Sequence, residues 1–272
     1  MNIAVVGDVG IDYYENLEII KPGGIAFNFA YNLKKSGVKN VSLVSILGKE
    51  SYSKKLLKLL KEAKIRSENI QIVNGNPPKQ MILLKKGERK FNGYDAGVLK
   101  KWKLRKKDLK FIENQNAVFV PLSDGMEQIF NAIKNIPNLI KVTDFSQDYE
   151  FADYNKKDNL ITKNAKYFDI IFIGGQKKYQ KMVEIVARRY PKKIIVLTLG
   201  SKGSLAYHLG AKYIQPSKKV KIVDTTGCGD AFQAGFLHSW LTKKDIKAAL
   251  IAGTNRATKN IEIVGSTPLK ME

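Results

Sequence analysis

The sequence predicts an α/β fold over residues 1–272, either as one domain or as one domain with a small separate β-sheet that could act as a lid. Short apolar runs rich in β-branched residues alternate with longer amphipathic segments, which is typical of a parallel sheet covered by helices. Several of these runs end in turns rich in Gly, Asp, Ser and Thr, where ligands bind in open α/β sheets. The stretch from about residue 70 to residue 95 has strand patterns without a helix between them, and this exception predicts the lid.

The composition is that of a globular protein, with 44% hydrophobic and 26% charged residues. The net charge of +22 would suit a nucleic-acid surface or a field that attracts anionic substrates such as nucleotides. Because the lysines are spread over nearly every predicted helix, we expect solvated helix faces and no nucleic-acid partner. The single cysteine, Cys228, excludes an internal disulfide and a cysteine-based metal site. The sequence has no signal peptide and no apolar run long enough to cross a bilayer, so we expect a cytoplasmic protein without a membrane partner.

The first predicted strand is the apolar run Ile3–Val6, which leads into a turn with two acids. Asp8 and Asp12 follow the carboxyl end of this strand, where a substrate would bind, although either could instead cap a turn. A short polar strand is expected over Glu15–Lys21.

A glycine pair, Gly23 and Gly24, introduces a helix that starts at Ile25 and stops at Gly37. Asn28 lies one turn into this helix, from which its amide could point into the same cleft as the two acids.

The lid is expected to combine residues of about 13–21 with residues of about 70–95. Strands over Ile70–Val73 and Gln80–Leu84 are followed by a hairpin turn at Gly87 and a return strand from Arg89. Such a sheet could close over a substrate, and its open edges would allow a homodimer through the lid.

The remaining strands of the main sheet are predicted from apolar runs at Val41–Ile46, Ala117–Val120, Leu139–Val142, Asp169–Ile173 and Lys193–Leu197. The last of these leads into a loop from Thr198 to Ser204 that is rich in glycine and serine. Its backbone N–H groups and hydroxyls could hold a phosphate or a ribose. Alternatively, the loop is a plain turn into a hairpin that Leu205–His208 completes.

A glycine-rich turn from Asp224 to Phe232 joins a predicted strand, Val220–Val223, to a helix. Gly227 and Gly229 let the backbone approach a ligand closely, and the first N–H groups of the helix favour an anion. Asp230 in this turn suits a base that removes a proton from an attacking hydroxyl. The alternative is an acid that only stabilises the start of its own helix.

Two stretches together resemble the ribokinase-like (PfkB) family of carbohydrate kinases. The first is Gly23-Gly24-x-x-x-Asn28-x-Ala30-x-x-Leu33-x-x-x-Gly37, and the second is Asp224-Thr-x-Gly227-Cys-Gly229-Asp230-x-Phe232. The resemblance extends over essentially the whole chain and implies a single domain over residues 1–272, built as a three-layer α/β/α Rossmann-like sandwich with a small β-sheet lid. It also implies an enzyme that uses ATP and Mg²⁺. It implies that Asp230 is the general base and that the N–H groups of Gly227, Cys228, Gly229 and Asp230 form an anion hole. It also implies that sugar hydroxyls are held by Asp12, Gly23, Gly24 and Asn28, and the nucleotide by Thr198, Gly200, Ser201, Gly203 and Asn255.

The sequence departs from the family pattern at two places. Many members carry Asn-x-x-Glu after the strand at 169–173, whereas this chain has Gly174-Gly175-Gln176-Lys177-Lys178. Lys177 or Lys178 could place a positive charge near the triphosphate instead, and the residues that hold the metal stay unknown. The second departure is the triplet Asp144-Phe145-Ser146, where many relatives have Asp-x-Asn. This triplet, the short lid, and Phe91 and Tyr94 most resemble the fructoselysine 6-kinase branch.

We therefore expect an ATP-dependent kinase that phosphorylates a primary hydroxyl of a ketose or ketose derivative, such as fructose or fructoselysine. Arg89 in the lid could pair with a carboxylate on the far end of such a substrate. The same motifs permit a nucleoside kinase or a 2-keto-3-deoxygluconate kinase. A protein of another class, a non-catalytic sugar or nucleotide sensor on the kinase fold, would have no need of Asp230 as a base.

Overall fold

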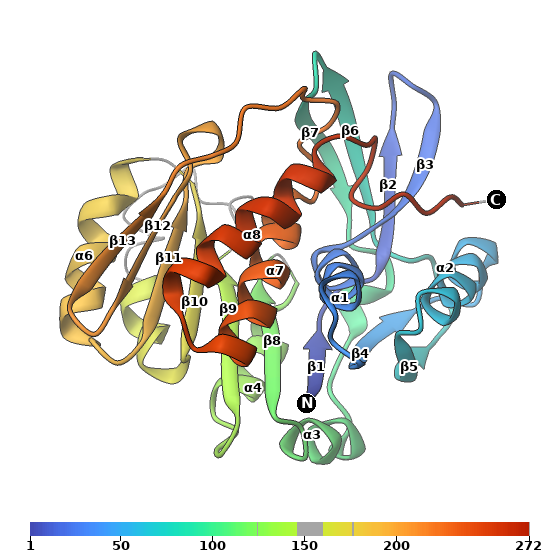
Figure 1. Ribbon diagram of the computed structural model, residues 1–272. Coiled ribbons are helices and arrows are strands. Elements are labelled where there is room, and N and C mark those ends of the chain that lie inside the picture. The colour runs from blue at the N-terminus through green and yellow to red at the C-terminus, as the bar shows by residue number, and fades with distance from the viewer. Residues whose placement is uncertain (124, 146–159, 176, 272) are drawn as a thin grey trace.

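The computed structural model describes residues 1–123, 125–145, 160–175 and 177–271, and two sheets organise this part of the chain (Figure 1). The larger sheet has the strand order β13-β12-β11-β10-β9-β8-β1-β4-β5. Its strands are β1 (Asn2–Val6), β4 (Asn40–Leu47), β5 (Arg66–Ile72), β8 (Ala117–Leu122), β9 (Ile140–Phe145), β10 (Ile170–Gly174), β11 (Ile194–Thr198), β12 (Ser204–His208) and β13 (Ala211–Gln215). Neighbours from β5 to β11 are parallel, and β12 and β13 add antiparallel strands at one edge.

Two apolar cores lie on opposite faces of this sheet, because successive side chains of a strand point to opposite sides. In β1, Ile3 and Val5 belong to one core and Ala4 and Val6 to the other. The first core is covered by α1 (Ile25–Ser36), α2 (Ser51–Glu62), α7 (Cys228–Lys243) and α8 (Ile246–Asn260). The second is covered by η1 (Gly97–Lys101), α3 (Lys106–Glu113), α4 (Glu127–Lys134) and α6 (Gln180–Arg189). The predicted three-layer sandwich is thus confirmed.

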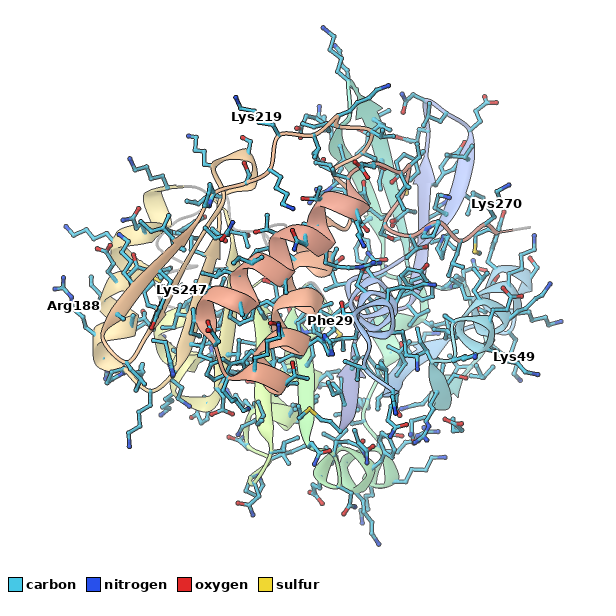
Figure 2. The ribbon with its side chains drawn as sticks, in the orientation of Figure 1. Phe29, Lys49, Arg188, Lys219, Lys247 and Lys270 are labelled. Atoms are coloured by element: carbon cyan, nitrogen blue, oxygen red, sulfur yellow. The ribbon has the colours of Figure 1, made fainter. Side chains whose placement is uncertain are left out.

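Helix α1 has the ends that the glycine pattern predicts. It begins after Gly24 and ends at Gly37, whose φ of 109° lies in the left-handed region and whose N–H bonds to the last turn. Phe29 fixes the helix to the sheet by stacking on Phe119 of β8, with ring centroids 3.8 Å apart, and Figure 2 labels this ring in the interior. The start of α1, which carries Asn28, is therefore held against the sheet.

The lid is a second sheet with the order β3-β2-β6-β7, and it lies beyond the carboxyl ends of the main strands (Figure 1). Its strands are β2 (Gly10–Tyr14), β3 (Ile19–Gly23), β6 (Lys79–Lys85) and β7 (Glu88–Asp95). The expectation of one strand over Glu15–Lys21 is wrong, because residues 15–18 form the turn between β2 and β3. Asn16 holds this turn against β6, since its side chain both donates to the Leu84 carbonyl and accepts from the Leu84 N–H.

Two further strand expectations are wrong. Ile70 belongs to β5 of the main sheet and not to the lid. Strand β5 pairs with the outer edge of β4, and in this position Ile70 joins the apolar core and is 8% exposed. The segment Val220–Val223 is not a strand. The N–H groups of Val223 and Asp224 donate to the Ile261 carbonyl, and therefore not to a neighbouring strand.

Positive charge is distributed around the molecule. Figure 2 labels Lys49, Arg188 and Lys219 near three separate margins of the chain. In the described ranges, no helix is long and apolar enough to cross a membrane.

Candidate active site

A cavity of about 1240 Å³ opens between the lid and the main sheet. Its lining includes Asp144, Gly174 and Thr198 at or near the carboxyl ends of β9, β10 and β11, where α/β sheets bind ligands. The lid contributes residues of β2, β6 and β7, and the starts of α1 and α7 complete the wall. The cavity thus brings together the two glycine motifs, which lie about 200 residues apart in the chain.

The start of α7 borders this cavity with Gly227, Cys228, Gly229 and Asp230. Gly227 caps the helix at a φ of 71°, in the left-handed region that favours glycine. A Cβ added to Gly229 would have no atom within 4 Å apart from its chain neighbours and the nearby backbone of its own helix, so the space next to this helix start is open. A helix start that faces open space is suited to an anion, as the sequence predicts.

Asp224 holds the turn before α7, although sequence reasoning gave this residue no role. Its buried carboxylate accepts hydrogen bonds from the N–H groups of Thr226 at 2.8 Å and Gly265 at 2.7 Å. The Tyr14 hydroxyl of the lid donates to the same carboxylate at 2.6 Å. An Asp that precedes a turn commonly bonds the backbone two residues on, and this signal was present in the sequence.

Asp230 lies half-buried in the first turn of α7 and accepts a 2.9 Å hydrogen bond from the Asn28 amide. Burial is the main reason why the pKa of Asp230 lies well above its ordinary value of 3.8, and the nearby carboxylates of Asp144 and Asp8 raise it further. The bond from Asn28 and the charge of Arg89 act in the opposite direction. A carboxylate with a raised pKa is a stronger base than an ordinary aspartate.

Asp12 lies in β2 of the lid, not in a loop after β1, and its side chain also lines the cavity. The residue is 5% exposed, and burial, Asp8 and Asp224 raise its pKa to about 8. Gly23 does not line the cavity but makes room for Asp12, because a Cβ at Gly23 would lie 2.2 Å from the Asp12 Oδ1.

Asp8 caps α1. Its carboxylate oxygens accept from the N–H groups of Ile25 at 3.2 Å and Ala26 at 3.4 Å. Gly24 precedes the helix with a φ of 99°, in the left-handed region. A Cβ added to Gly24 would lie only 2.7 Å from the Asp8 carbonyl oxygen. Because the Asp8 carboxylate already accepts from these N–H groups, they are not free to bind an anion. What the start of α1 contributes to the cavity is the Asn28 side chain.

Arg89 connects the lid to the turn before α7. Its guanidinium donates to the Thr225 carbonyl at 2.8 Å and lies over the Phe91 ring, 5.0 Å from the centroid. The backbone N–H of Arg89 also donates to the Thr225 hydroxyl at 3.2 Å. The sequence predicts that Arg89 meets the far end of the substrate, whereas its hydrogen-bond partner, Thr225, belongs to the turn before α7.

The loop after β11 lines the other part of the cavity with Thr198, Gly200, Ser201 and Gly203. Gly203 has a φ of 89°, and a Cβ there would lie 2.2 Å from the Gln215 carbonyl oxygen, so this position requires glycine. Asn255 of α8, the predicted adenine neighbour, is not among the lining residues, whereas its helix neighbours Thr254, Ala257 and Thr258 are.

Two cations that the sequence did not single out, Lys218 and Lys219, line the cavity from the segment after β13. Lys177 is exposed and does not line it, and the side chain of Lys178 lies outside the described part of the chain, as do Gln176 and Ser146.

Two buried polar atoms in the wall, the Ser204 hydroxyl and the Gln233 Oε1, have no hydrogen-bond partner among the described residues. A buried polar atom without a partner is unfavourable, which fits a cavity whose ligand supplies the missing bonds.

The chain matches the model of the pfkB family carbohydrate kinases over residues 2–271. It belongs to the pfkB family. Fructosamine kinase FrlD of Bacillus subtilis is 27% identical, over 98% of this chain and 93% of its own length. Fructoselysine 6-kinase of Escherichia coli is 25% identical, over 97% of this chain and 98% of its own.

A third relative, the nucleoside kinase of Methanocaldococcus jannaschii, is 24% identical over 97% of this chain and 91% of its own length. The crystal structure of that enzyme, described as an archaeal member of the ribokinase family, has a TM-score of 0.77 at 21% identity. The structural match covers 99% of this chain and 95% of the other, which confirms the ribokinase-like fold. As a pfkB family member, the chain is an ATP-dependent kinase of the carbohydrate and nucleoside type, and the alternative of a non-catalytic sensor is set aside.

Proposed function

We propose that this pfkB kinase transfers the γ-phosphoryl group of ATP to a primary hydroxyl of a ketose or ketose derivative, with Asp230 as general base. The observation that carries the proposal is the position of Asp230, in the first turn of α7, bonded to Asn28 and beside an open helix start. The fructosamine and fructoselysine kinases that match nearly the whole chain support a ketose joined to an amine as the acceptor.

In this mechanism the acceptor hydroxyl loses its proton to the Asp230 carboxylate while its oxygen attacks the γ-phosphorus of ATP. The bond from that phosphorus to the β–γ bridging oxygen breaks, and ADP leaves with the electron pair. The raised pKa of Asp230 favours proton removal. The N–H groups of Gly227, Gly229 and Asp230 would bind the oxygens of the transferring group. The expected fourth donor, the Cys228 N–H, instead donates to the Thr225 carbonyl at 3.3 Å. Arg89 would add positive charge at the same turn.

Mg²⁺ fits the donors of this cavity, since it prefers oxygen ligands and keeps several waters and phosphate oxygens. The described residues contain no group of three side chains of metal-ligating type, so the protein would hold the ion through few groups. Asp144, which lines the cavity near the end of β9, is the carboxylate that we assign to it. When bound, the ion would neutralise negative charge on the phosphate oxygens.

The acceptor should be unphosphorylated. The lid and the start of α1 present Asp12, Gln80 and Asn28 to the cavity, and these groups suit hydroxyls and not a second phosphate. We assign Asp12, Gly24 and Asn28 to the sugar, with Gly23 making room for Asp12. We assign Thr198, Gly200, Ser201 and Gly203 to the nucleotide, and Asn255 to the vicinity of the adenine.

A second candidate is a nucleoside kinase, because the Methanocaldococcus jannaschii relative with that name matches 97% of the chain. ADP release should therefore be measured with fructoselysine, fructose, 2-keto-3-deoxygluconate, cytidine and adenosine as acceptors. We expect the highest kcat/KM for fructoselysine. A clear preference for a nucleoside or for a phosphorylated sugar would contradict the proposed acceptor class.

The role of Asp230 is tested by Asp230→Asn, which keeps the shape of the side chain but not its basicity. We expect kcat to fall by about 10²–10⁴-fold or more, with ATP affinity and thermal stability retained. Asp245→Asn is the matched control, because Asp245 caps α8 through the Ala248 N–H and asparagine caps equally well. If Asp230→Asn stayed within a few-fold of wild-type turnover, another group would have to be the base.

A further inference from the structure

Ser266 lies in the segment that follows α8 and is completely buried against the two glycine motifs. Its hydroxyl donates a short hydrogen bond to the Oδ1 of Asn28, and its other acceptor, the Pro22 carbonyl oxygen, is more distant at 3.4 Å. The contact with the turn before α7 is also tight, because a Cβ on Gly227 would lie 2.4 Å from the Ser266 Cβ. Ser266 therefore touches both the helix cap next to the proposed anion hole and the amide that reaches the proposed base.

Asn28 uses both ends of its amide, and the two bonds fix its orientation. Its Nδ2 donates to Asp230 at 2.9 Å, and an ionised carboxylate can only accept, so the NH₂ group must face Asp230. The amide oxygen then faces Ser266, and the serine hydroxyl must donate. Without that donor, the amide could rotate by half a turn and present its oxygen to the Asp230 carboxylate.

Hydrogen bonds hold the backbone both just before Ser266 and a few residues after it. The N–H of the preceding residue, Gly265, donates to the Asp224 carboxylate at 2.7 Å. Further along, Lys21 of β3 donates to the Leu269 carbonyl at 3.1 Å, and Figure 1 shows this segment passing the lid strands. The serine hydroxyl is thus presented to Asn28 from a fixed backbone.

We propose that Ser266 is a positioning residue for phosphoryl transfer: its hydroxyl orients the Asn28 amide, which in turn holds Asp230 in place for proton removal. This inference rests on the proposed role of Asp230 as the base. Ser266 does not line the cavity, so it acts through Asn28 and not by contact with the substrate.

The experiment is a double-mutant cycle with kinetics. Ser266→Ala should lower kcat about tenfold, as expected for one lost hydrogen bond in the reacting geometry, while KM for ATP changes less than about twofold. In an Asn28→Ala background, which is itself slower, Ser266→Ala should change kcat less than about twofold, because its target is gone. Thr267→Val is the matched control: Thr267 is 1% exposed and its hydroxyl has no hydrogen-bond partner within the described residues, so kcat should stay at wild-type level.

The outcomes separate this inference from the function on which it rests. Suppose that Asp230→Asn is inactive. Ser266 then has no positioning role if Ser266→Ala keeps the wild-type kcat, or if it lowers the kcat of Asn28→Ala by the same factor as that of wild type. If Asp230→Asn keeps its activity, the proposed base is wrong, whatever Ser266 does. Should Ser266→Ala fail to fold in a thermal melt, Ser266→Cys replaces it, because the thiol keeps the shape but donates weakly and should give the same loss of kcat.

Discussion

Tyr14 of the lid and Asp224 of the turn before α7 are joined by a 2.6 Å hydrogen bond, and neither side chain has exposed surface. The lid is therefore bonded to the turn that starts α7. Burial, together with the acids Asp12 and Asp224, raises the pKa of Tyr14, so its hydroxyl remains a donor at every ordinary pH.

We expect Tyr14→Phe to lower the free energy of unfolding by about 1.5–3 kcal/mol, because it removes a buried donor from a carboxylate. Urea unfolding measures this loss. Tyr13→Phe is the control, since Tyr13 is partly exposed and lies near Lys79 at the ring face, and it should change the value by less than about 0.5 kcal/mol. Equal losses in the two variants would show that the bond to Asp224 contributes nothing.

Asp12 predicts a particular dependence of stability on pH. The pKa of this acid rises from 3.8 to about 8 on folding, so the folded chain keeps it neutral while the unfolded chain ionises it. Between about pH 4 and pH 8 this group therefore destabilises the fold increasingly, by up to about 1.4 kcal/mol per pH unit. Asp12→Asn should remove this loss, so its advantage over wild type should grow with pH across this window. The comparison at pH 4 serves as the internal control, and a constant difference at all pH values would contradict the raised pKa.

Arg89→Ala distinguishes two roles of the lid arginine. If the guanidinium pairs with a substrate carboxylate, fructoselysine and 2-keto-3-deoxygluconate should lose about 1.5–3 kcal/mol of transition-state binding, while fructose barely changes. These values come from kcat/KM for the three acceptors, with Lys90→Ala as the exposed neighbouring control. Equal losses for all three would contradict the pairing and indicate action at the Thr225 turn.

Lys218 and Lys219 should help to bind the triphosphate, because they are cations in the cavity wall. We expect Lys218→Ala combined with Lys219→Ala to raise KM for ATP by about two- to thirtyfold at low salt, since each exposed pair contributes about 0.2–1 kcal/mol. The effect should shrink in high salt. Lys221→Ala, an exposed lysine of the same segment that does not line the cavity, is the control. If KM for ATP stayed unchanged in the Lys218/Lys219 double variant as well as in the control, these two lysines would have no role in nucleotide binding.

The sequence predicts the interior of the fold well, because buried parallel strands are continuous apolar runs. Ile170–Gly174 and Ile194–Thr198 lie within one residue of their expected positions for this reason. The lid strands were predicted less well, since their pairing depends on residues far apart in the chain. The position of the turn at residues 15–18 depends on Asn16 bonding to Leu84, which no local pattern in the sequence can indicate.

The two parts of the proposed site differ in the same way. The glycines at positions 227 and 24 are visible in the sequence, because their left-handed or crowded backbone requires glycine. Ser266 is an ordinary serine in an irregular segment, and only the fold brings it to Asn28. Arg89 lines the cavity, but its hydrogen-bond partner Thr225, 136 positions away, could not be predicted from the sequence.

The lid consists of two hairpins, Gly10–Gly23 and Lys79–Asp95, that come from separate parts of the chain and meet through the parallel pair β2–β6. It therefore does not form a cassette that recombination could exchange between relatives as one contiguous insert. A new acceptor preference in this architecture should arise by single substitutions on the inner face of the lid. Grafting a lid from another enzyme would require two simultaneous replacements whose edge register still matches.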